Sequence, residues 1–123
     1  MKILLSIKPE YVKKIFSGQK KYEFRRSIFK NKKTTHIVVY ASSPISKVVG
    51  EFEIINILHD DVAALWQRTR FLAGISEEKF FDYFSDKDKG YAIQIGKTQR
   101  YQHALSVKGK YGLSPPQSFA YLP

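Results

Sequence analysis

Residues 18–26 (Gly-Gln-Lys-Lys-Tyr-Glu-Phe-Arg-Arg) are the segment that most limits what this chain can fold into. They follow a helix-like stretch and read as a strand, yet they hold four cations and one carboxylate. Side chains alternate between the two faces of a strand, so Lys21, Glu23 and Arg25 share one face. The other face mixes two cations with two aromatic rings. Because neither face is plainly apolar, this strand either serves a site or protects a sheet edge.

The length and composition predict one folded domain spanning residues 1–123. The hydrophobic content of 43% and aromatic content of 15% are typical of a globule with a core rather than a disordered chain. The chain has no cysteine, which excludes a disulfide framework, a thiolate nucleophile and a cysteine-ligated zinc site. This composition fits a reducing cytosol, so we expect a cytoplasmic protein. The apolar run in residues 1–8 is too short for a signal peptide or a membrane span, and we expect no membrane partner.

The net charge of +10 is unevenly distributed along the chain. Residues 1–33 hold eleven Lys or Arg and two acids, residues 34–90 hold six and nine, and residues 91–123 hold four and none. The two ends are therefore basic and the middle is acidic. If the ends meet in the fold, they form one electropositive surface whose natural partner is a polyanion. The alternative is a basic surface that only keeps the protein in solution.

Hydrophobic periodicity and turn residues predict a mixed fold. Strands are expected at residues 2–7, 20–26, 37–41, 47–55, 90–95 and 101–107. Helices are expected from Pro9 to Gly18, from Asp60 or Asp61 to Gly74, and after Ser76. Gly50 inside its strand indicates a bulge or a close backbone approach. Strands with few helices and no regular alternation favour an α+β fold, a small mixed β-barrel decorated by two to three helices.

The charged strand has two interpretations on residue chemistry alone. Lys21 and Arg25 could bind an anion while Glu23 orients the guanidinium or accepts a hydrogen bond. Alternatively, Glu23 and Arg25 could form a simple ion pair on a solvated edge strand. The three histidines are far apart and form no ligand pair, so no metal is expected. The sequence has no P-loop and no dinucleotide fingerprint, so no cofactor is expected either.

The pattern Gly18-x-Lys20-x-x-Glu23-x-Arg25 resembles the G-x-K-x-x-E-x-R signature of the ASCH domains, part of the PUA-like superfamily. Flanking blocks agree along nearly the whole chain: residues 5–11, 40–44, 48–52, 75–76, 90–93 and 115–119. The resemblance implies a PUA-like β-barrel with a cleft beside the signature that holds RNA or a modified nucleobase. Members are described as RNA-binding proteins or transcription coregulators. Some small members hydrolyse the acetyl amide of N4-acetylcytidine, and some are reported to cut RNA.

The resemblance also implies roles for particular residues. The lysine that is essential in the amidohydrolase members matches Lys20, but Glu23 stands where those members have a threonine. Residues 70–75 offer no counterpart of their carboxylate before the second helix. If the protein is an enzyme, Lys20 and Glu23 are the expected catalytic residues, provided that burial lowers the pKa of Lys20.

The expected function is a nucleic-acid-binding module for RNA or a modified nucleotide, with a regulatory role in transcription or translation. The alternatives are an amidohydrolase on N4-acetylcytidine or a ribonuclease using the same cleft. DNA is the other polyanion considered, and the oligomeric state is left open. The expected contact residues are Lys20, Lys21, Glu23, Arg25, Arg26, Tyr40, Ser42, Ser43 and Tyr91. Tyr40 or Tyr91 is expected to stack on a base. Strict alternation puts Lys20 opposite Glu23, so both reach one site only if Lys20 precedes the strand proper.

Overall fold

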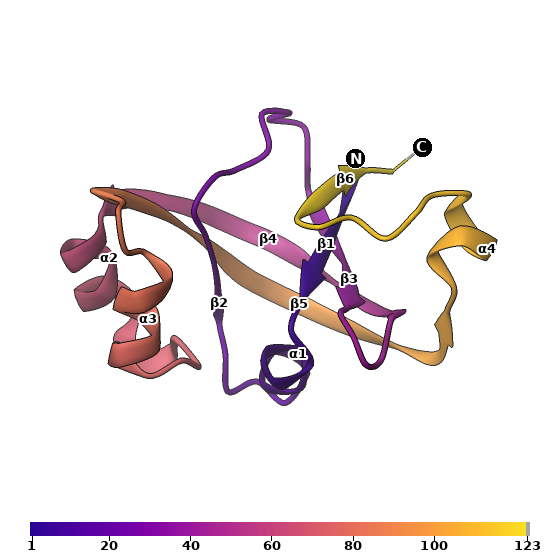
Figure 1. Ribbon diagram of the computed structural model, residues 1–123, viewed down its shortest axis with the longest axis horizontal. Coiled ribbons are helices and arrows are strands. Elements are labelled where there is room, and N and C mark those ends of the chain that lie inside the picture. The colour runs from indigo at the N-terminus through magenta and orange to yellow at the C-terminus, as the bar shows by residue number, and fades with distance from the viewer. Residues whose placement is uncertain (123) are drawn as a thin grey trace.

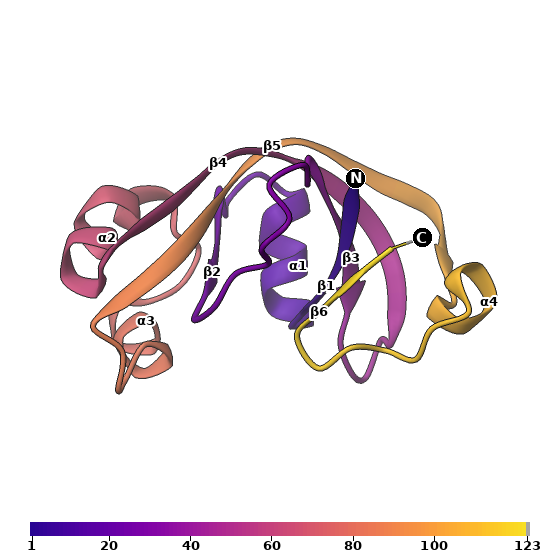
Figure 2. The same ribbon diagram turned by 90° about the horizontal axis from the view of Figure 1, so that it is seen from above.

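One strongly curled sheet carries the fold in the computed structural model, which describes residues 1–122. Its strands are β1 (Lys2–Ile7), β2 (Tyr22–Arg25), β3 (His36–Ala41), β4 (Lys47–Asp61), β5 (Lys89–Leu105) and β6 (Phe119–Tyr121). Their order is β2-β5-β4-β3-β1-β6, with β1 and β3 parallel and all other neighbours antiparallel. The long strands β4 and β5 arch over helix α1 (Figure 2). The result is a half-barrel, which confirms the predicted α+β class.

Four α-helices lie within residues 1–122, one more than the two to three that were predicted. They are α1 (Pro9–Phe16), α2 (Val62–Thr69), α3 (Glu77–Tyr83) and α4 (Val107–Tyr111), and a short 3-10 helix, η1 (Arg70–Leu72), follows α2. As predicted, α1 starts at Pro9, and Gly18 just beyond it has a φ of +85°. The Ser76 side chain caps α3, whereas no side chain caps α2 at Asp61. The sequence prediction missed α4, a single turn capped by Ser106.

Strands β4 and β5 are longer than predicted because their ladder bends without breaking. Register shifts at three places in the β4–β5 ladder absorb the curvature, so β5 is one strand where two were expected. Gly50 lies at one of these shifts. A Cβ at Gly50 would sit 2.5 Å from the Phe16 ring and 2.6 Å from the Gln99 carbonyl oxygen. The predicted bulge or close backbone approach at Gly50 is confirmed.

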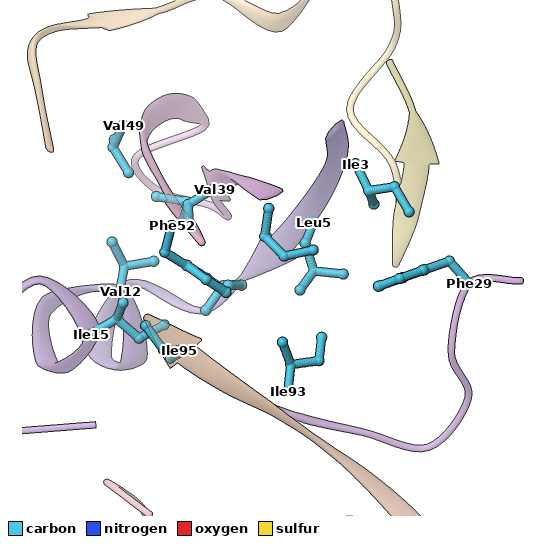
Figure 3. Packing of buried hydrophobic residues seen from close by; sticks show 13 residues of the cluster. Ile3, Leu5, Val12, Ile15, Phe29, Val39, Val49, Phe52, Ile93 and Ile95 are labelled. Carbon is cyan, nitrogen blue, oxygen red and sulfur yellow. The ribbon is translucent and has the colours of Figure 1, made fainter. Parts of the chain in front are cut away.

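Three apolar clusters organise the interior. The first lies between α1 and the concave face of the sheet, where Val12 and Ile15 meet strand residues such as Ile93 (Figure 3). The second joins α2 and α3 to Phe24 on the other face of β2. The third lies under α4 and contains Tyr40. Strand β2 thus separates α1 on one side from α3 on the other.

The two ends of the described chain lie side by side (Figure 1). Strand β6 pairs with β1, with Ile3 opposite Tyr121, and the Leu122 amide donates to the Lys2 carbonyl oxygen at 3.3 Å. The two basic ends of the sequence therefore meet, as a single electropositive surface requires. No helix among residues 1–122 is long and apolar enough to cross a membrane.

Candidate functional site

A cavity of about 810 Å³ opens between α1, the start of β2 and α3. Helix α1 contributes Glu10 and Tyr11, and α3 contributes Asp82 and Tyr83. The end of β1 and the tail before β6 complete the wall, and the tail adds Ser118. The cleft therefore lies where the signature strand meets two helices that belong to different apolar clusters.

Lys20 is the most buried charged residue in this cleft, with 2% of its surface exposed. Its Nζ donates to the Ala73 carbonyl oxygen at 2.7 Å and lies 5.0 Å from the centroid of the Tyr11 ring and 4.8 Å from that of Phe24. Burial lowers the pKa of the Lys20 amine to about 8, while the charge of Glu23 opposes this change. A substantial fraction of Lys20 is thus neutral in mildly alkaline solution.

The backbone carbonyl groups of residues 72–74 each accept a hydrogen bond from a lysine of residues 14–21, and we call these three residues the carbonyl shelf. The Leu72 carbonyl accepts from the Lys21 amide at 2.8 Å, and the Gly74 carbonyl accepts from Lys14 Nζ at 3.3 Å. The Ala73 carbonyl between them holds Lys20. Gly74 has a φ of +65°, and a Cβ there would lie 2.5 Å from Lys20 Cβ. A glycine is required at this point both for the backbone and for the lysine stem.

Glu23 and Arg25 form a directed pair on the cleft side of β2. Arg25 Nη1 lies 3.1 Å from Glu23 Oε2 and also donates to the Ser6 carbonyl oxygen at 3.3 Å. Arg25 Nη2 donates to Ser118 Oγ at 3.0 Å. Strands β2 and β6 are the two edges of the sheet, and we call the line where β2 faces the β1–β6 pair the seam of the half-barrel. Arg25 bridges this seam. Arg25 thereby fixes the carboxylate of Glu23, which is 5% exposed.

Several residues that the sequence nominated do line this cleft. They are Lys20, Glu23, Arg25, Arg26 and Ser42. Lys20 precedes β2, so it reaches the same cavity as Glu23, which is the condition that strand alternation imposed. The Arg26 guanidinium is bonded to the backbone, because its Nη1 donates to the Tyr83 and Ser85 carbonyl oxygens at 2.8 and 2.9 Å. Arg26 anchors the end of α3.

The other nominated residues do not line the cleft. Lys21 and Ser43 are not part of the cavity wall. Tyr40 is 5% exposed and packs with Val38 in the cluster under α4, because alternation along β3 points both away from the α1 side. Tyr91 pairs in register with Arg25, but its ring stacks on His59 with centroids 4.2 Å apart and does not line the cavity.

Tyr11 and Tyr83 are the tyrosines that line the cleft, and sequence reasoning missed both. Tyr11 is four residues before Ile15, so its spacing resembles that of a core residue on α1. Burial is the main cause of the raised pKa of both hydroxyls, and Glu10 and Glu23 raise that of Tyr11 further. Both tyrosines are therefore neutral at physiological pH, and their uncharged rings form part of the cleft wall.

The mouth of the cleft carries charge of both signs. Lys79 Nζ on α3 lies 3.8 Å from Glu10 Oε2 on α1, and both side chains are more than half exposed. Lys8 and Asp82 are the remaining charged lining residues. Within residues 1–122 no three histidine or acidic side chains gather as metal ligands. The cleft thus has exposed cations at its mouth and an amine, a carboxylate and aromatic rings inside.

An α+β half-barrel with a cleft built around a G-x-K-x-x-E-x-R strand defines a specific class of small domain. The chain belongs to the ASCH domain family, whose model matches residues 5–104. It is 32% identical over 124 residues to the ASCH domain-containing ribonuclease of Zymomonas mobilis, covering 97% of this chain and 82% of that protein. The crystal structure of ASCH from Zymomonas mobilis superposes with a TM-score of 0.90, covering 99% of this chain and 87% of that chain, at 32% identity.

More distant similarities are also present. The chain is 25% identical over 120 residues to large ribosomal subunit protein uL22 of Ureaplasma parvum, and it spans only 39% of that protein. It also superposes on the N-terminal domain of Staphylothermus marinus McrB with a TM-score of 0.54 at 13% identity, which concerns the fold alone.

Proposed function

We propose that the cleft binds RNA and holds one nucleotide between α1 and α3. The observation that carries this proposal is that one cavity, walled by Tyr11 and Tyr83, contains both a buried Lys20 bonded to a carbonyl oxygen and a Glu23 carboxylate held by Arg25. The net charge of +10 supports a polyanionic ligand. The name of the Zymomonas mobilis relative, a ribonuclease, supports RNA over DNA.

Each wall of the cleft has a role in this proposal. The cations Lys8 and Lys79 at the mouth neutralise phosphates, which gives affinity without sequence choice. Tyr11 and Tyr83 supply aromatic faces for an unpaired base, the usual mode of single-stranded RNA recognition. Glu23 accepts a hydrogen bond from an amino group on the base edge, as carboxylates do with the cytosine amine. Lys20 donates to a base or ribose oxygen.

Binding is tested with a fluorescein-labelled single-stranded RNA at 50 and 200 mM salt. We expect affinity to fall steeply as salt rises, because phosphate contacts release counterions. A DNA of the same sequence shows whether the ribose hydroxyl is recognised. Lys20→Ala should weaken binding at both salt concentrations, whereas Lys87→Ala, on the turn before β5, should not. An affinity that does not change with salt would contradict the proposal.

RNA cleavage is the second candidate, and the lowered pKa of Lys20 favours it. A neutral Lys20 amine would take the proton of a ribose 2′-hydroxyl. The 2′ oxygen would attack phosphorus, the bond from phosphorus to the 5′ oxygen would break, and that oxygen would take a proton from solvent. The products are a 2′,3′-cyclic phosphate and a 5′-hydroxyl.

Product analysis separates the binding module from an enzyme. Cleavage would yield cyclic phosphate ends, would stop with Lys20→Met, and would stop when the cut nucleotide is 2′-deoxy. The same preparation incubated with N4-acetylcytidine tests amide hydrolysis. Salt-sensitive binding with no turnover of either substrate would establish the module alone.

A further inference from the structure

Phe71 in η1 is the most exposed large apolar side chain among residues 1–122, at 84%. The Arg70 guanidinium carbon lies 4.5 Å from the centroid of the Phe71 ring, so the cation covers one face of the ring. The other face is open to solvent. This exposed ring is combined with a positive charge, and an aromatic base could stack on its free face.

The backbone that follows Phe71 is bonded to the cleft through the carbonyl shelf. Leu72, directly after Phe71, bonds to the Lys21 amide, and Ala73 bonds to the Lys20 amine inside the cleft. Ile75, at the end of the same loop, lines the cavity. Only three residues thus separate the exposed ring from the cleft wall, and hydrogen bonds hold the chain between them.

The chain segments that meet at the carbonyl shelf carry cations. Residues 11–22 contain four lysines and no acid, of which Lys20 is buried in the cleft and Lys14 donates to the Gly74 carbonyl oxygen. Residues 62–76 contain Arg68, which is paired with Asp60 at 3.2 Å, and Arg70, which lies over Phe71. The net charge of +10 favours an anionic partner. A nucleic acid offers both a base for the ring and phosphates for the cations.

We propose that Phe71 and Arg70 form a stacking platform for a second base of single-stranded RNA, outside the cleft. The platform rests on the proposed function, that the cleft itself holds a nucleotide. It narrows the ligand to an unpaired strand of two or more nucleotides, because a base in a duplex is already stacked on both faces. Stacking of this kind tolerates any base, so the platform adds affinity and leaves sequence choice to the cleft.

The test compares uridine 5′-monophosphate with a twelve-residue oligouridylate on the full chain. Phe71→Ala should weaken oligouridylate binding roughly tenfold and leave monophosphate binding unchanged. The salt slope should stay the same, because no phosphate contact is lost, whereas Arg70→Gln should reduce that slope by about one. Phe71→Leu keeps an apolar side chain without a ring and should behave like Phe71→Ala. Phe71→Trp should retain affinity and show quenching beyond that of Trp66 when the RNA binds.

Each other outcome has a definite meaning. If wild type binds the oligouridylate, Lys20→Ala weakens that binding and Phe71→Ala does not, the platform is refuted while the proposed function stands. If wild type binds no RNA, both are refuted. If Phe71→Ala leaves RNA affinity unchanged but alters the sedimentation of the protein, Phe71 is a contact between copies, which also overturns the platform.

Discussion

Lys20 shows what it costs a fold to bury a charged side chain. Its amine is removed from water, which disfavours the charged form, and a single carbonyl together with two aromatic rings replaces the lost hydration. The cost is visible as a pKa of about 8, against an ordinary value of 10.5. A residue that destabilises its own fold in this way is typical of a functional position.

Replacing Lys20 with methionine should change how stability depends on pH. Between about pH 8 and 10.5 the unfolded wild-type chain holds a proton on Lys20 that the folded chain releases, so wild-type stability rises with pH there. Below pH 8 the folded protein bears the full cost of burying a charged Lys20. Between pH 7 and pH 10.5 the unfolding free energy of the wild type should therefore rise by roughly 2–4 kcal/mol relative to that of Lys20→Met. Urea unfolding at both pH values measures this gain, with the exposed Lys79→Met as control; a constant difference would contradict it.

Gly74 should be more sensitive to substitution than a glycine of similar backbone conformation. Gly112 has a φ of +69° with open space at its Cβ position, whereas Gly74, at +65°, faces the stem of Lys20. We expect Gly112→Ala to cost about 1 kcal/mol and Gly74→Ala about 2–4 kcal/mol, because a clash adds to the backbone strain. Only Gly74→Ala should also weaken RNA binding. Thermal unfolding and anisotropy measure both effects, and equal losses in the two variants would refute the role of the shelf.

At this scale the sequence predicted the signature better than its surroundings. Lys20, Glu23 and Arg25 could be placed because a residue before the strand escapes alternation. Tyr11 and the carbonyl shelf could not be predicted. Tyr11 has the spacing of a core residue, and the sequence of side chains does not show which backbone carbonyl groups will accept a hydrogen bond. Tyr40 was misplaced because a run of apolar residues does not tell which face of a strand meets which core.

Among the elements, the seam between β2 and the β1–β6 pair decides whether the half-barrel keeps its shape. Within residues 1–122 no strand pairing closes it, since β2 and β6 are the two sheet edges. Arg25 crosses it instead, with donors to the backbone of β1 and to the tail. The sequence foresaw most strands and helices, but it could not foresee the seam, because the pairing of distant strands depends on the curvature of the whole sheet.

Arg25→Lys should loosen the tail selectively. Lysine keeps the charge but cannot reach Glu23, Ser6 and Ser118 together, so we expect a loss of about 1–3 kcal/mol in unfolding free energy. Amide exchange should quicken in residues 117–122. Arg26→Lys is the matched control, because Arg26 holds the end of α3, and exchange should quicken in residues 83–88 instead. The same exchange pattern in both variants would rule out a seam role for Arg25.

Over the whole molecule, the pairing of β1 with β6 brings the basic ends together and makes the backbone almost a closed ring. The sequence shows the uneven charge directly, because charged residues can be counted along the chain without knowledge of the fold. That the ends meet depended on a parallel β1–β3 pairing with β6 added outside, which local patterns do not encode.

A circular permutant checks this closure. Joining the ends with a short linker and opening the chain between the exposed Lys32 and Lys33 should leave the unfolding free energy within about 1 kcal/mol and RNA binding intact. Opening between Gly74 and Ile75 should instead release Lys20 and abolish binding. Calorimetry and anisotropy on both permutants give the answer, and binding lost in both would show that closure matters beyond the shelf.

A domain whose ends lie side by side can be inserted into another protein, the host, without forcing the host chain apart at the insertion point. Inserted into a surface loop, it would leave the flanking residues of the host as near each other as before, so the host fold would feel little strain. The same geometry allows a donor and an acceptor dye on the two flanks to start close together. An increase in the distance between the dyes would then report the unpairing of β1 from β6, so energy transfer between them would measure whether the domain is folded.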